Sequence, residues 1–225
     1  MPQITVLMPC LDEESNIAFC IQEAAAYIRG RGVSGGVLVV DNGSTDRSAE
    51  IAEEHGAEVI VEPRRGYGCA LRTGLAAAEG DVIILGDCDS TYDFAHLDPI
   101  YGPLAAGEAD LMVGDRFAGQ MERGAMSLSH RLGVSLLSWC GRKRFGVQVN
   151  DWHCGLRGIR KDALAKLELR ADGMEFATEL IAEAARKGLR IGEAGVSLRA
   201  SRFPRVNKLR TVRDGLRHLR YIVRG

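Results

Sequence analysis

Two aspartates, Asp87 and Asp89, directly follow an apolar segment near the middle of the chain, Val82–Gly86. Residues two apart on an extended backbone project to the same side, so the two carboxylates would converge and repel each other unless a cation lies between them. Carboxylate oxygens suit Mg²⁺ or Mn²⁺, and an ion held this way commonly bridges phosphate oxygens. The spacing therefore indicates a divalent metal site, with Cys88 turned toward the core. Acids also end strands for purely structural reasons, which is the competing interpretation.

Four more acids follow the first two apolar segments of the chain: Asp12, Glu13, Glu14 and Asp41. Helix N-termini attract acids for capping and dipole reasons, which accounts for Asp12 and Glu14 as well as a ligand does. Asp41 begins the sequence DNGSTD, where Asn-Gly favours a tight turn and the Ser or Thr can cap a following helix. We expect Asp41 to project from the sheet edge and to recognise a base or a ribose.

Two other segments contain residues that could do chemistry. The segment Arg65–Gly68, with sequence RGYG, lacks the full GxGxxG spacing and the lysine of a phosphate-binding loop. It is either a glycine-rich helix start or a place where Arg64 or Arg65 contacts a nucleotide. The adjacent His153 and Cys154 do not by themselves make a metal site, and we expect Cys154 in the core.

A sheet that brings strand ends together must position these residues. Short apolar segments alternate with Ala-, Glu- and Leu-rich segments of helical spacing, which predicts an α/β fold with right-handed crossovers and a mostly parallel sheet flanked by helices. Ligands of such sheets bind at the carboxyl ends of the strands. The expected strands are Ile4–Met8, Gly36–Val40, Glu58–Val61, Val82–Gly86 and Leu111–Gly114, and the expected helices are Glu14–Arg29, Asp46–His55, Tyr67–Ala78 and Phe94–Ala106.

The alternation stops after Gly114, and the segment Arg123–Asn150 contains five Lys or Arg residues and no acid. Its apolar residues predict a partly amphipathic helix. Ordered α/β character resumes with the expected strands Leu156–Ile159 and Arg190–Leu198, the helix Met174–Lys187 and a final amphipathic helix Leu209–Val223. No Pro- or Ser-rich linker, repeat or low-complexity segment divides the chain, so residues 1–225 are predicted to form one domain.

Composition narrows the class of protein. Of the 225 residues, 46% are hydrophobic and 26% are charged, which excludes a disordered, collagen-like or coiled-coil chain. No apolar stretch reaches about 18 residues and no basic leader precedes the first apolar segment, so we expect neither a spanning helix nor a signal peptide, and a cytoplasmic location. The six cysteines include no CxxC pair, which favours reduced thiols over a zinc site.

The net charge of −1 conceals a basic C-terminal end, because the stretch from Arg199 to Gly225 contains nine Lys or Arg residues and one acid, Asp214. A basic end behind an acidic body suggests an anionic surface as partner, either a membrane or nucleic acid. Nucleic acid is disfavoured because the body is acidic and only Phe203 and Tyr221 could stack on bases there. The apolar residues of the final helix alternate with arginines as in an interfacial helix, or else they pack on the body.

Several short motifs occur in a specific order along the chain. They are PCLDEE at Pro9–Glu14, VVDNGSTD at Val39–Asp46, GYGCALRTG at Gly66–Gly74, GDCDSTYDF at Gly86–Phe94, GDRF at Gly114–Phe117, DWHCGLR at Asp151–Arg157, GMEFATEL at Gly173–Leu180 and KLRTVRDGLRHLRY at Lys208–Tyr221. In this order the sequence resembles family 2 glycosyltransferases of the GT-A fold, above all the bacterial polyprenyl-phosphate glycosyltransferases, relatives of dolichol-phosphate mannose and glucose synthases. The resemblance covers almost the whole chain.

The resemblance implies a GT-A (Rossmann-like) fold and roles for individual residues. The predicted nucleotide-sugar site contains Pro9, Leu11, Glu13, Asp41, Arg65, Asp87 and Cys88, the metal ligands are Asp87 and Asp89, and Arg116 and Arg131 match basic residues near the donor diphosphate and the acceptor phosphate. Residues 1–115 would form the nucleotide-sugar half, and residues 116–225 the acceptor half with the basic C-terminal helix. Three positions depart from the family pattern: Asp12 replaces a frequent Asn, Asn42 replaces the second Asp of DDGS, and Cys88 replaces a small residue.

The implied reaction is transfer of a hexose, with inversion, from a nucleoside diphosphate sugar of the UDP-glucose or GDP-mannose type to a polyprenyl phosphate. The implied cofactor is Mg²⁺ or Mn²⁺. A lipid monophosphate is largely dianionic near neutral pH, so it needs no general base in order to attack. The enzyme would then work at the inner face of the membrane, and the resemblance is compatible with a homo-oligomer, although no residue pattern marks an interface.

The alternative within the same fold is a soluble transferase that acts on a hydroxyl of a saccharide, a peptide or a small metabolite. A hydroxyl acceptor needs a general base, for which Asp151 in DWHCG is the candidate and Glu175 and Glu179 are weaker ones. The candidate catalytic residues are therefore Asp89, Arg116, Arg131 and Asp151. A further hypothesis is that Arg202, Arg205 and Lys208 form a lid over the donor.

Overall fold

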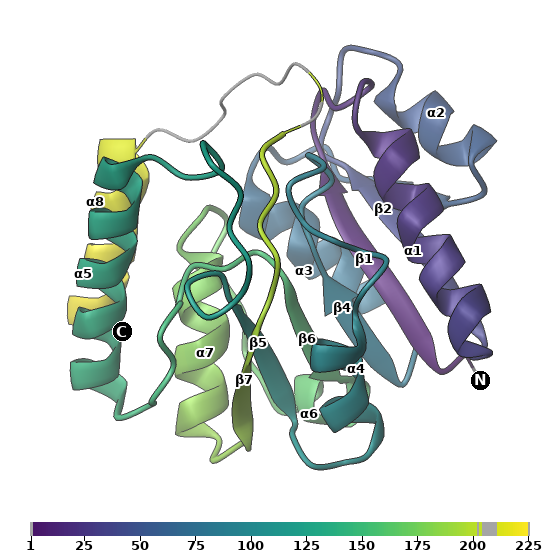
Figure 1. Cartoon of the computed structure of the whole chain (residues 1–225). Helices are drawn as coiled ribbons and strands as arrows, with labels where there is room; N and C mark the ends of the chain where they lie inside the picture. Colours follow the sequence, from purple (N-terminus) through teal and green to yellow (C-terminus); the bar gives the residue numbers. More distant parts are fainter. Residues whose placement is uncertain (1, 202, 204–210, 225) are drawn as a thin grey trace.

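One sheet dominates the structure, a computed structural model that describes residues 2–201, 203 and 211–224 (Figure 1). Its strands are short apolar segments, and the central ones are buried on both faces, as expected for strands covered by helices. Seven strands are present in the described residues: β1 (Ile4–Cys10), β2 (Gly35–Asp41), β3 (Glu58–Val61), β4 (Val82–Leu85), β5 (Leu111–Asp115), β6 (Arg157–Arg160) and β7 (Ile191–Gly195).

The strand order is β3-β2-β1-β4-β6-β5-β7. Strand β1 pairs in parallel with β2 and β4, β2 pairs in parallel with β3, and β5 pairs in parallel with β7, so the predicted mostly parallel sheet is confirmed. In this register Cys10 lies opposite Asp41, and Leu7 lies opposite Leu85. The acids that follow β1, β2 and β4 are therefore brought to one edge of the sheet.

Strand β6 is the exception, because it runs antiparallel to both of its neighbours, β4 and β5. Arg157, its first residue, lies opposite Leu85 near the end of β4 and Val113 near the end of β5. The loop that precedes β6 thus starts from the edge at which the parallel strands end. This reversal places Asp151 at the same edge as the strand-end acids.

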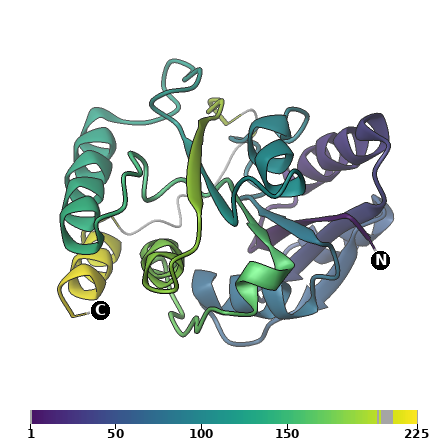
Figure 2. The same cartoon turned by 90° about the horizontal axis from the view of Figure 1, so that it is seen from below.

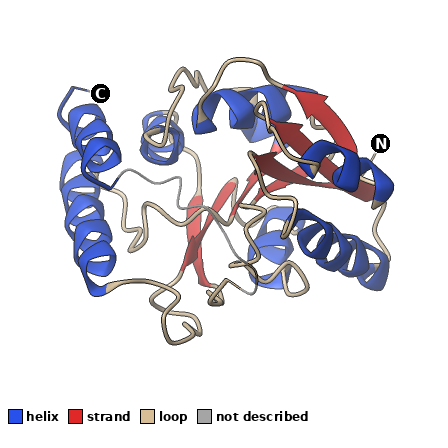
Figure 3. Cartoon of the chain, turned by 90° about the horizontal axis from the view of Figure 1, so that it is seen from above, coloured by secondary structure: helices blue, strands red, loops and turns tan. Residues whose placement is uncertain are grey.

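Helices cover both faces of the sheet (Figure 2). Helices α1 and α4 lie on one face and α3 and α7 on the other, while α5 and α8 lie side by side at one end of the molecule, next to α7 (Figures 1 and 3). The helix bounds are α1 (Ile17–Arg31), α2 (Ser48–Glu54), α3 (Tyr67–Ala77), α4 (Asp98–Ala105), α5 (Leu128–Phe145), α6 (Lys161–Leu164), α7 (Phe176–Arg186) and α8 (Thr211–Arg224). None of these described helices combines the length and the apolar composition that a bilayer span requires.

The structure confirms the predicted elements, with shifted ends. Helix α1 begins at Ile17 instead of Glu14, because Asp12 adopts a left-handed backbone with φ 48° and the chain turns before the helix starts. Helix α4 begins at Asp98, where Pro99 occupies the first turn, the position that suits its fixed φ. The prediction that Ser44 or Thr45 caps α2 is wrong, because that helix begins at Ser48.

Candidate active site

The two aspartates of the predicted metal site lie immediately beyond β4. The hydroxyl of Tyr67, the first residue of α3, donates a hydrogen bond of 2.9 Å to Oδ1 of Asp87. Oδ1 of Asp89 accepts hydrogen bonds from the backbone N–H and the hydroxyl of Thr91. Ser90 has φ 63°, so the chain makes a sharp turn immediately after Asp89. Each carboxylate is thus oriented by a neighbouring side chain.

The charge of Asp89 acts on Asp87, which precedes it by two residues. Withdrawal of its carboxyl group from water, and then the negative charge of Asp89, raise the pKa of Asp87 to about 6, against a usual value of 3.8. The positive charge of Arg116 acts in the opposite direction and lowers the pKa of Asp87. A cation bound beside Asp87 would offset both the loss of water and the charge of Asp89, so it would favour the ionised carboxylate.

The donor set fits Mg²⁺ or Mn²⁺ in one specific way. Within the described parts of the chain, no group of three or more His, Cys, Asp and Glu side chains could hold a metal ion by itself. Asp87 and Asp89 can therefore supply only part of a coordination shell. Small hard cations are commonly bound by one or two carboxylates plus substrate phosphates, so the pair suits an ion that arrives with a phosphate ligand.

Gly155, in the loop before β6, leaves the space that Asp87 occupies. A Cβ atom at residue 155 would overlap Oδ2 of Asp87 and would lie 3.0 Å from its Cγ. The backbone N–H of Gly155 donates a hydrogen bond of 2.7 Å to the hydroxyl of Tyr92, which holds the loop in place. Close approach of a backbone is a role that glycine alone can fill.

Cys88 is turned into the core, as predicted. It is buried, and its thiol donates a hydrogen bond of 3.2 Å to the carbonyl of Pro9 in β1. A hydrogen bond with Cys10, and then burial, raise the pKa of Cys88 well above its usual value, so the group stays a neutral thiol. Cys88 thereby joins the metal-site loop to the end of β1, and Cys154 is also buried in the core, as expected.

The loops after β1 and β2 are tied to each other by their polar side chains. Asp12 accepts a hydrogen bond of 2.7 Å from the backbone N–H of Thr45, and the N–H of Asp12 donates to the hydroxyl of Ser44. The N–H of Glu13 donates to the hydroxyl of Ser48 over 2.7 Å. The structural interpretation of Asp12 is thereby supported, and Glu14, whose N–H donates to Asp46, belongs to the same contact between loops.

Four residues of the predicted nucleotide site lie at this edge. Pro9 and Leu11 are partly buried, whereas Glu13 and Asp41 are buried. Both oxygens of Asp41 accept backbone N–H groups of its own loop, from Gly43 and Ser44 at 3.1–3.3 Å. Asp41 therefore closes a tight turn. We expected its side chain to project from the sheet edge, but it is buried and folded back onto its own loop.

The RGYG segment is a helix start that depends on its glycines. A Cβ atom at Gly66 or Gly68 would overlap a backbone carbonyl of residues 171–172, which cross the beginning of α3. Arg64 forms an ion pair of 2.8 Å with Glu62. Arg65 is exposed, and its guanidinium lies over Gly43. Of the two arginines, Arg65 is the one placed beside the loop that follows β2.

Arg116, which follows β5, and Asp151, in the loop before β6, form a buried ion pair. Nε and Nη2 of Arg116 donate to the two oxygens of Asp151 at 2.6 and 2.8 Å, and the backbone N–H of Arg116 donates to the same carboxylate at 3.3 Å. The side chains are 7% and 0% exposed. Asp151 therefore holds Arg116 in place, with both of its oxygens engaged.

The weaker candidates for a base are also engaged elsewhere. Glu179 is buried and accepts hydrogen bonds from the backbone N–H groups of Arg170 and Ala171. Glu175 forms an ion pair of 2.7 Å with Arg217 of α8. Both carboxylates therefore stabilise the packing of α7 with its neighbours.

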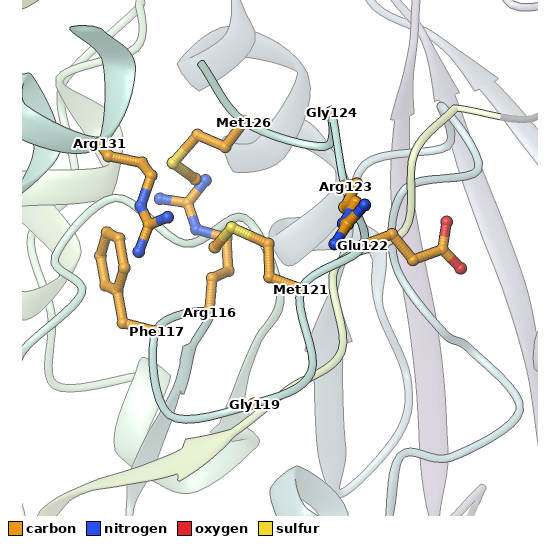
Figure 4. A pocket seen from close by; sticks show the side chains of 9 residues that line it. All are labelled: Arg116, Phe117, Gly119, Met121, Glu122, Arg123, Gly124, Met126 and Arg131. Carbon is orange, nitrogen blue, oxygen red and sulfur yellow. The ribbon is translucent and has the colours of Figure 1, made fainter. Parts of the chain in front are cut away.

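Arg116 lines a cavity of about 220 Å³ between β5 and α5 (Figure 4). The side chains that face it include three arginines and two methionines, namely Arg116, Arg123, Arg131, Met121 and Met126. The Arg131 guanidinium stacks over the ring of Phe117 at 5.9 Å. Glu122 also borders the cavity, but its carboxylate points away in Figure 4 and accepts a hydrogen bond from the backbone N–H of Ala200. The cavity is thus suited to an anion.

Three residues of this edge are absent from the set predicted from the sequence: Tyr67, Gly155 and Arg157. Arg157 is buried and donates to the backbone carbonyls of Cys154, Trp152 and Ala177, which fixes the loop that contains Gly155. The sequence feature that could have identified them is their position inside the motifs GYGCALRTG and DWHCGLR. Arg202, Arg205 and Lys208, the residues of the lid hypothesis, lie outside the described residues.

The sheet with aspartates at its parallel strand ends and the arginine-lined cavity fit a sugar-nucleotide-dependent transferase of the GT-A fold, as the comparisons show. The chain belongs to glycosyl transferase family 2, whose family model matches residues 5–167. A crystal structure of glucosyl-3-phosphoglycerate synthase from Mycobacterium tuberculosis, in complex with Mn²⁺, UDP-glucose and phosphoglyceric acid, has a TM-score of 0.79 and 25% identity. The similarity covers 98% of this chain and 79% of that one.

Curated relatives include transferases of hexoses. The low-salt glycan biosynthesis hexosyltransferase Agl6 of Haloferax volcanii is 37% identical over 99% of this chain, which spans only 53% of that relative. An uncharacterized glycosyltransferase of Mycobacterium tuberculosis, Rv0539, is 35% identical over 86% of this chain and 84% of its own. A dolichyl-phosphate hexose transferase of Haloferax volcanii is 30% identical over 87% of this chain and 82% of its own.

Proposed function

We propose that the chain transfers a hexose from a nucleoside diphosphate sugar to a polyprenyl phosphate, with inversion at the anomeric carbon and with Mg²⁺ or Mn²⁺ as cofactor. The observation that carries this proposal is the pairing of Arg116 with Asp151. The pairing occupies the carboxylate that a hydroxyl acceptor would need, while Arg123 and Arg131 give the cavity its positive charge. A phosphate monoester fits both properties, because it is anionic and attacks without a base.

The metal site supports the donor half of the proposal. Asp87 and Asp89 would hold the cation, which neutralises the charge that develops on the leaving diphosphate. Mn²⁺ and UDP-glucose are bound by the similar glucosyl-3-phosphoglycerate synthase, and we infer the same classes of ligand here. Tyr67 orients Asp87 through its hydrogen bond, and Gly155 leaves room for that carboxylate.

The basic cavity supports the acceptor half. Gly155, which packs against Asp87, lies four residues after Asp151, the partner of Arg116, so we infer that an anion at Arg116 would lie near the donor diphosphate. Arg131 and Arg123 extend the positive charge away from that point. Holding two reactants in line contributes a large part of the rate enhancement when no proton transfer is needed. The dolichyl-phosphate hexose transferase among the relatives acts on a lipid phosphate, which agrees with this assignment.

A second candidate is transfer to a hydroxyl of a small phosphorylated metabolite. It is favoured by the structural similarity to the synthase that was crystallised with phosphoglyceric acid. The same arginine-lined cavity would then bind the phosphate of the acceptor, and another group would have to act as base.

One assay tests both candidates. The full chain is incubated with Mn²⁺ and radiolabelled UDP- or GDP-hexoses, and with either a polyprenyl phosphate in detergent or phosphoglycerate. We expect label in the lipid fraction, and no transfer by the Asp89→Asn variant. Label on phosphoglycerate instead would establish the second candidate, and donor binding without transfer to either acceptor would overturn the lipid assignment.

A further inference from the structure

Helix α5 turns a stripe of large apolar side chains to solvent. Their exposed fractions lie between 52% and 76%, and the residues are Leu128, Leu132, Leu136 and Trp139. Spacings of four, four and three residues put them on one side of the helix. The opposite side carries the buried residues Val134, Ser138 and Gly141, which pack toward the body. The stripe is therefore the outer face of α5 and is not part of the core.

Helix α8, which lies beside α5, has the same organisation (Figures 1 and 2). Leu216 and Val223 are 60% and 70% exposed, and Leu219 between them is 39% exposed. The side of α8 that faces the body carries the buried residues His218 and Ile222. Two neighbouring helices at one end of the molecule thus each expose an apolar stripe, which is unusual for a surface that faces only water.

The charges around the two stripes are positive. The segment Arg123–Asn150, which includes all of α5, contains no acid, and Arg213, Arg220 and Arg224 are exposed beside the stripe of α8. Symmetric pairing of α5 with a second copy of the chain would bring arginines against arginines. An anionic lipid surface complements both the apolar stripes and the cations.

We propose that α5 and α8 form the surface by which the enzyme docks on an anionic lipid bilayer, with the leucines and Trp139 entering the interface. This inference builds on the proposed function, since it places the acceptor cavity. Arg131 lines that cavity and lies on the first turn of α5, between Leu128 and Leu132. A phosphate held by Arg131 would then be within about one helical turn of side chains buried in the bilayer.

Vesicle binding tests the docking surface without donor or acceptor. Vesicles of phosphatidylcholine with 30% phosphatidylglycerol, and vesicles of phosphatidylcholine alone, are sedimented with the full chain at low and high salt. We expect binding to the anionic vesicles, weakened by salt, and a blue shift of Trp139 fluorescence. The variant Leu132→Ser/Leu136→Ser should lose roughly tenfold or more in vesicle affinity, because two exposed leucines no longer enter the interface.

The control is Val61→Ser, at an exposed apolar residue of β3 that is 63% exposed and far from α5 along the sheet. It should bind vesicles as the wild type does. Unchanged binding by the double variant would overturn the proposal, as would a wild-type dimer that the double variant disrupts without any binding to vesicles. Transfer to a short polyprenyl phosphate in detergent separates the two inferences, because it should survive in the double variant even if docking fails.

Discussion

Tyr67 donates a hydrogen bond of 2.9 Å to Oδ1 of Asp87, and so connects the first residue of α3 to the end of β4. The carboxylate of Asp87 is withdrawn from water and lies near the charge of Asp89, and both effects raise its pKa. A donor that holds one oxygen in a fixed direction orients the other oxygen relative to a bound cation. Outer partners of metal ligands act in this way in many metal sites.

The first prediction concerns that hydrogen bond. Tyr67→Phe keeps the ring but removes the donor, so we expect Mn²⁺ affinity to fall about tenfold in the presence of the nucleoside diphosphate of the donor. Titration of Mn²⁺ followed by electron paramagnetic resonance measures it directly. Tyr27→Phe is the matched control, since it removes a tyrosine–aspartate hydrogen bond to Asp98, between α1 and α4. Equal affinities for both variants would contradict a role of Tyr67 in the metal site.

The second prediction concerns the space beside Asp87. Gly155→Ala puts a methyl group where Oδ2 of Asp87 lies, and the carboxylate must move. We expect about a tenfold or larger loss of Mn²⁺ affinity, together with a lower melting temperature, because the methyl group overpacks a buried site. The control is Gly133→Ala in α5, where a Cβ atom meets nothing within 4 Å. If Gly155→Ala binds the ion normally, Asp87 does not need the position seen here.

The third prediction separates the two roles considered for Asp151. Asp151→Asn leaves the buried guanidinium of Arg116 without its anion, so we expect the free energy of unfolding to fall by about 3 kcal/mol, together with a loss of transfer. The double variant Arg116→Met/Asp151→Leu should recover most of the stability but none of the activity. Urea unfolding and the transfer assay measure both quantities. Full stability of Asp151→Asn with loss of transfer would instead indicate a general base.

The fold could be predicted from the sequence because alternating apolar and helical segments leave few arrangements of strands and crossovers. The direction of β6 could not, because a strand of four residues, Arg157–Arg160, carries no signal for parallel or antiparallel pairing. The sequence also could not show which face of α8 contacts the body. Its apolar and basic stripes were visible, but the body is contacted by His218 and Ile222 while Leu216 and Val223 stay exposed.

The candidate site also has one part that the sequence predicts and another part that only the fold brings together. Asp87 and Asp89 are two residues apart and follow an apolar strand, so spacing alone predicts that they converge. Tyr67 and Gly155 reach Asp87 from positions 20 and 68 residues away in the sequence, and only the folded sheet brings them there. Asp151 is a candidate from the sequence, but its pairing with Arg116 depends on the antiparallel course of β6, which no spacing in the sequence predicts.

The last prediction concerns pH and the packing of α8. His218 is buried and its Nδ1 lies 2.8 Å from the hydroxyl of Thr178 in α7, with the ring of His153 against it at 4.4 Å. Burial lowers the pKa of His218 to about 4, although Glu175 opposes the shift, and the charges of Arg157 and Arg217 add to it.

Above pH 6.5 the His218 ring is neutral in both the folded and the unfolded chain, so it does not affect stability. As the pH falls from 6.5 to about 4, only the unfolded chain takes up this proton, and the free energy of unfolding falls by up to roughly 1.4 kcal/mol per pH unit. Below about pH 4 both states are protonated and the loss stops. Urea unfolding between pH 7.5 and 4 measures the slope. His218→Gln has no ionisable ring, so its slope in this range should be smaller than that of the wild type, whereas equal slopes would show that protons bind elsewhere.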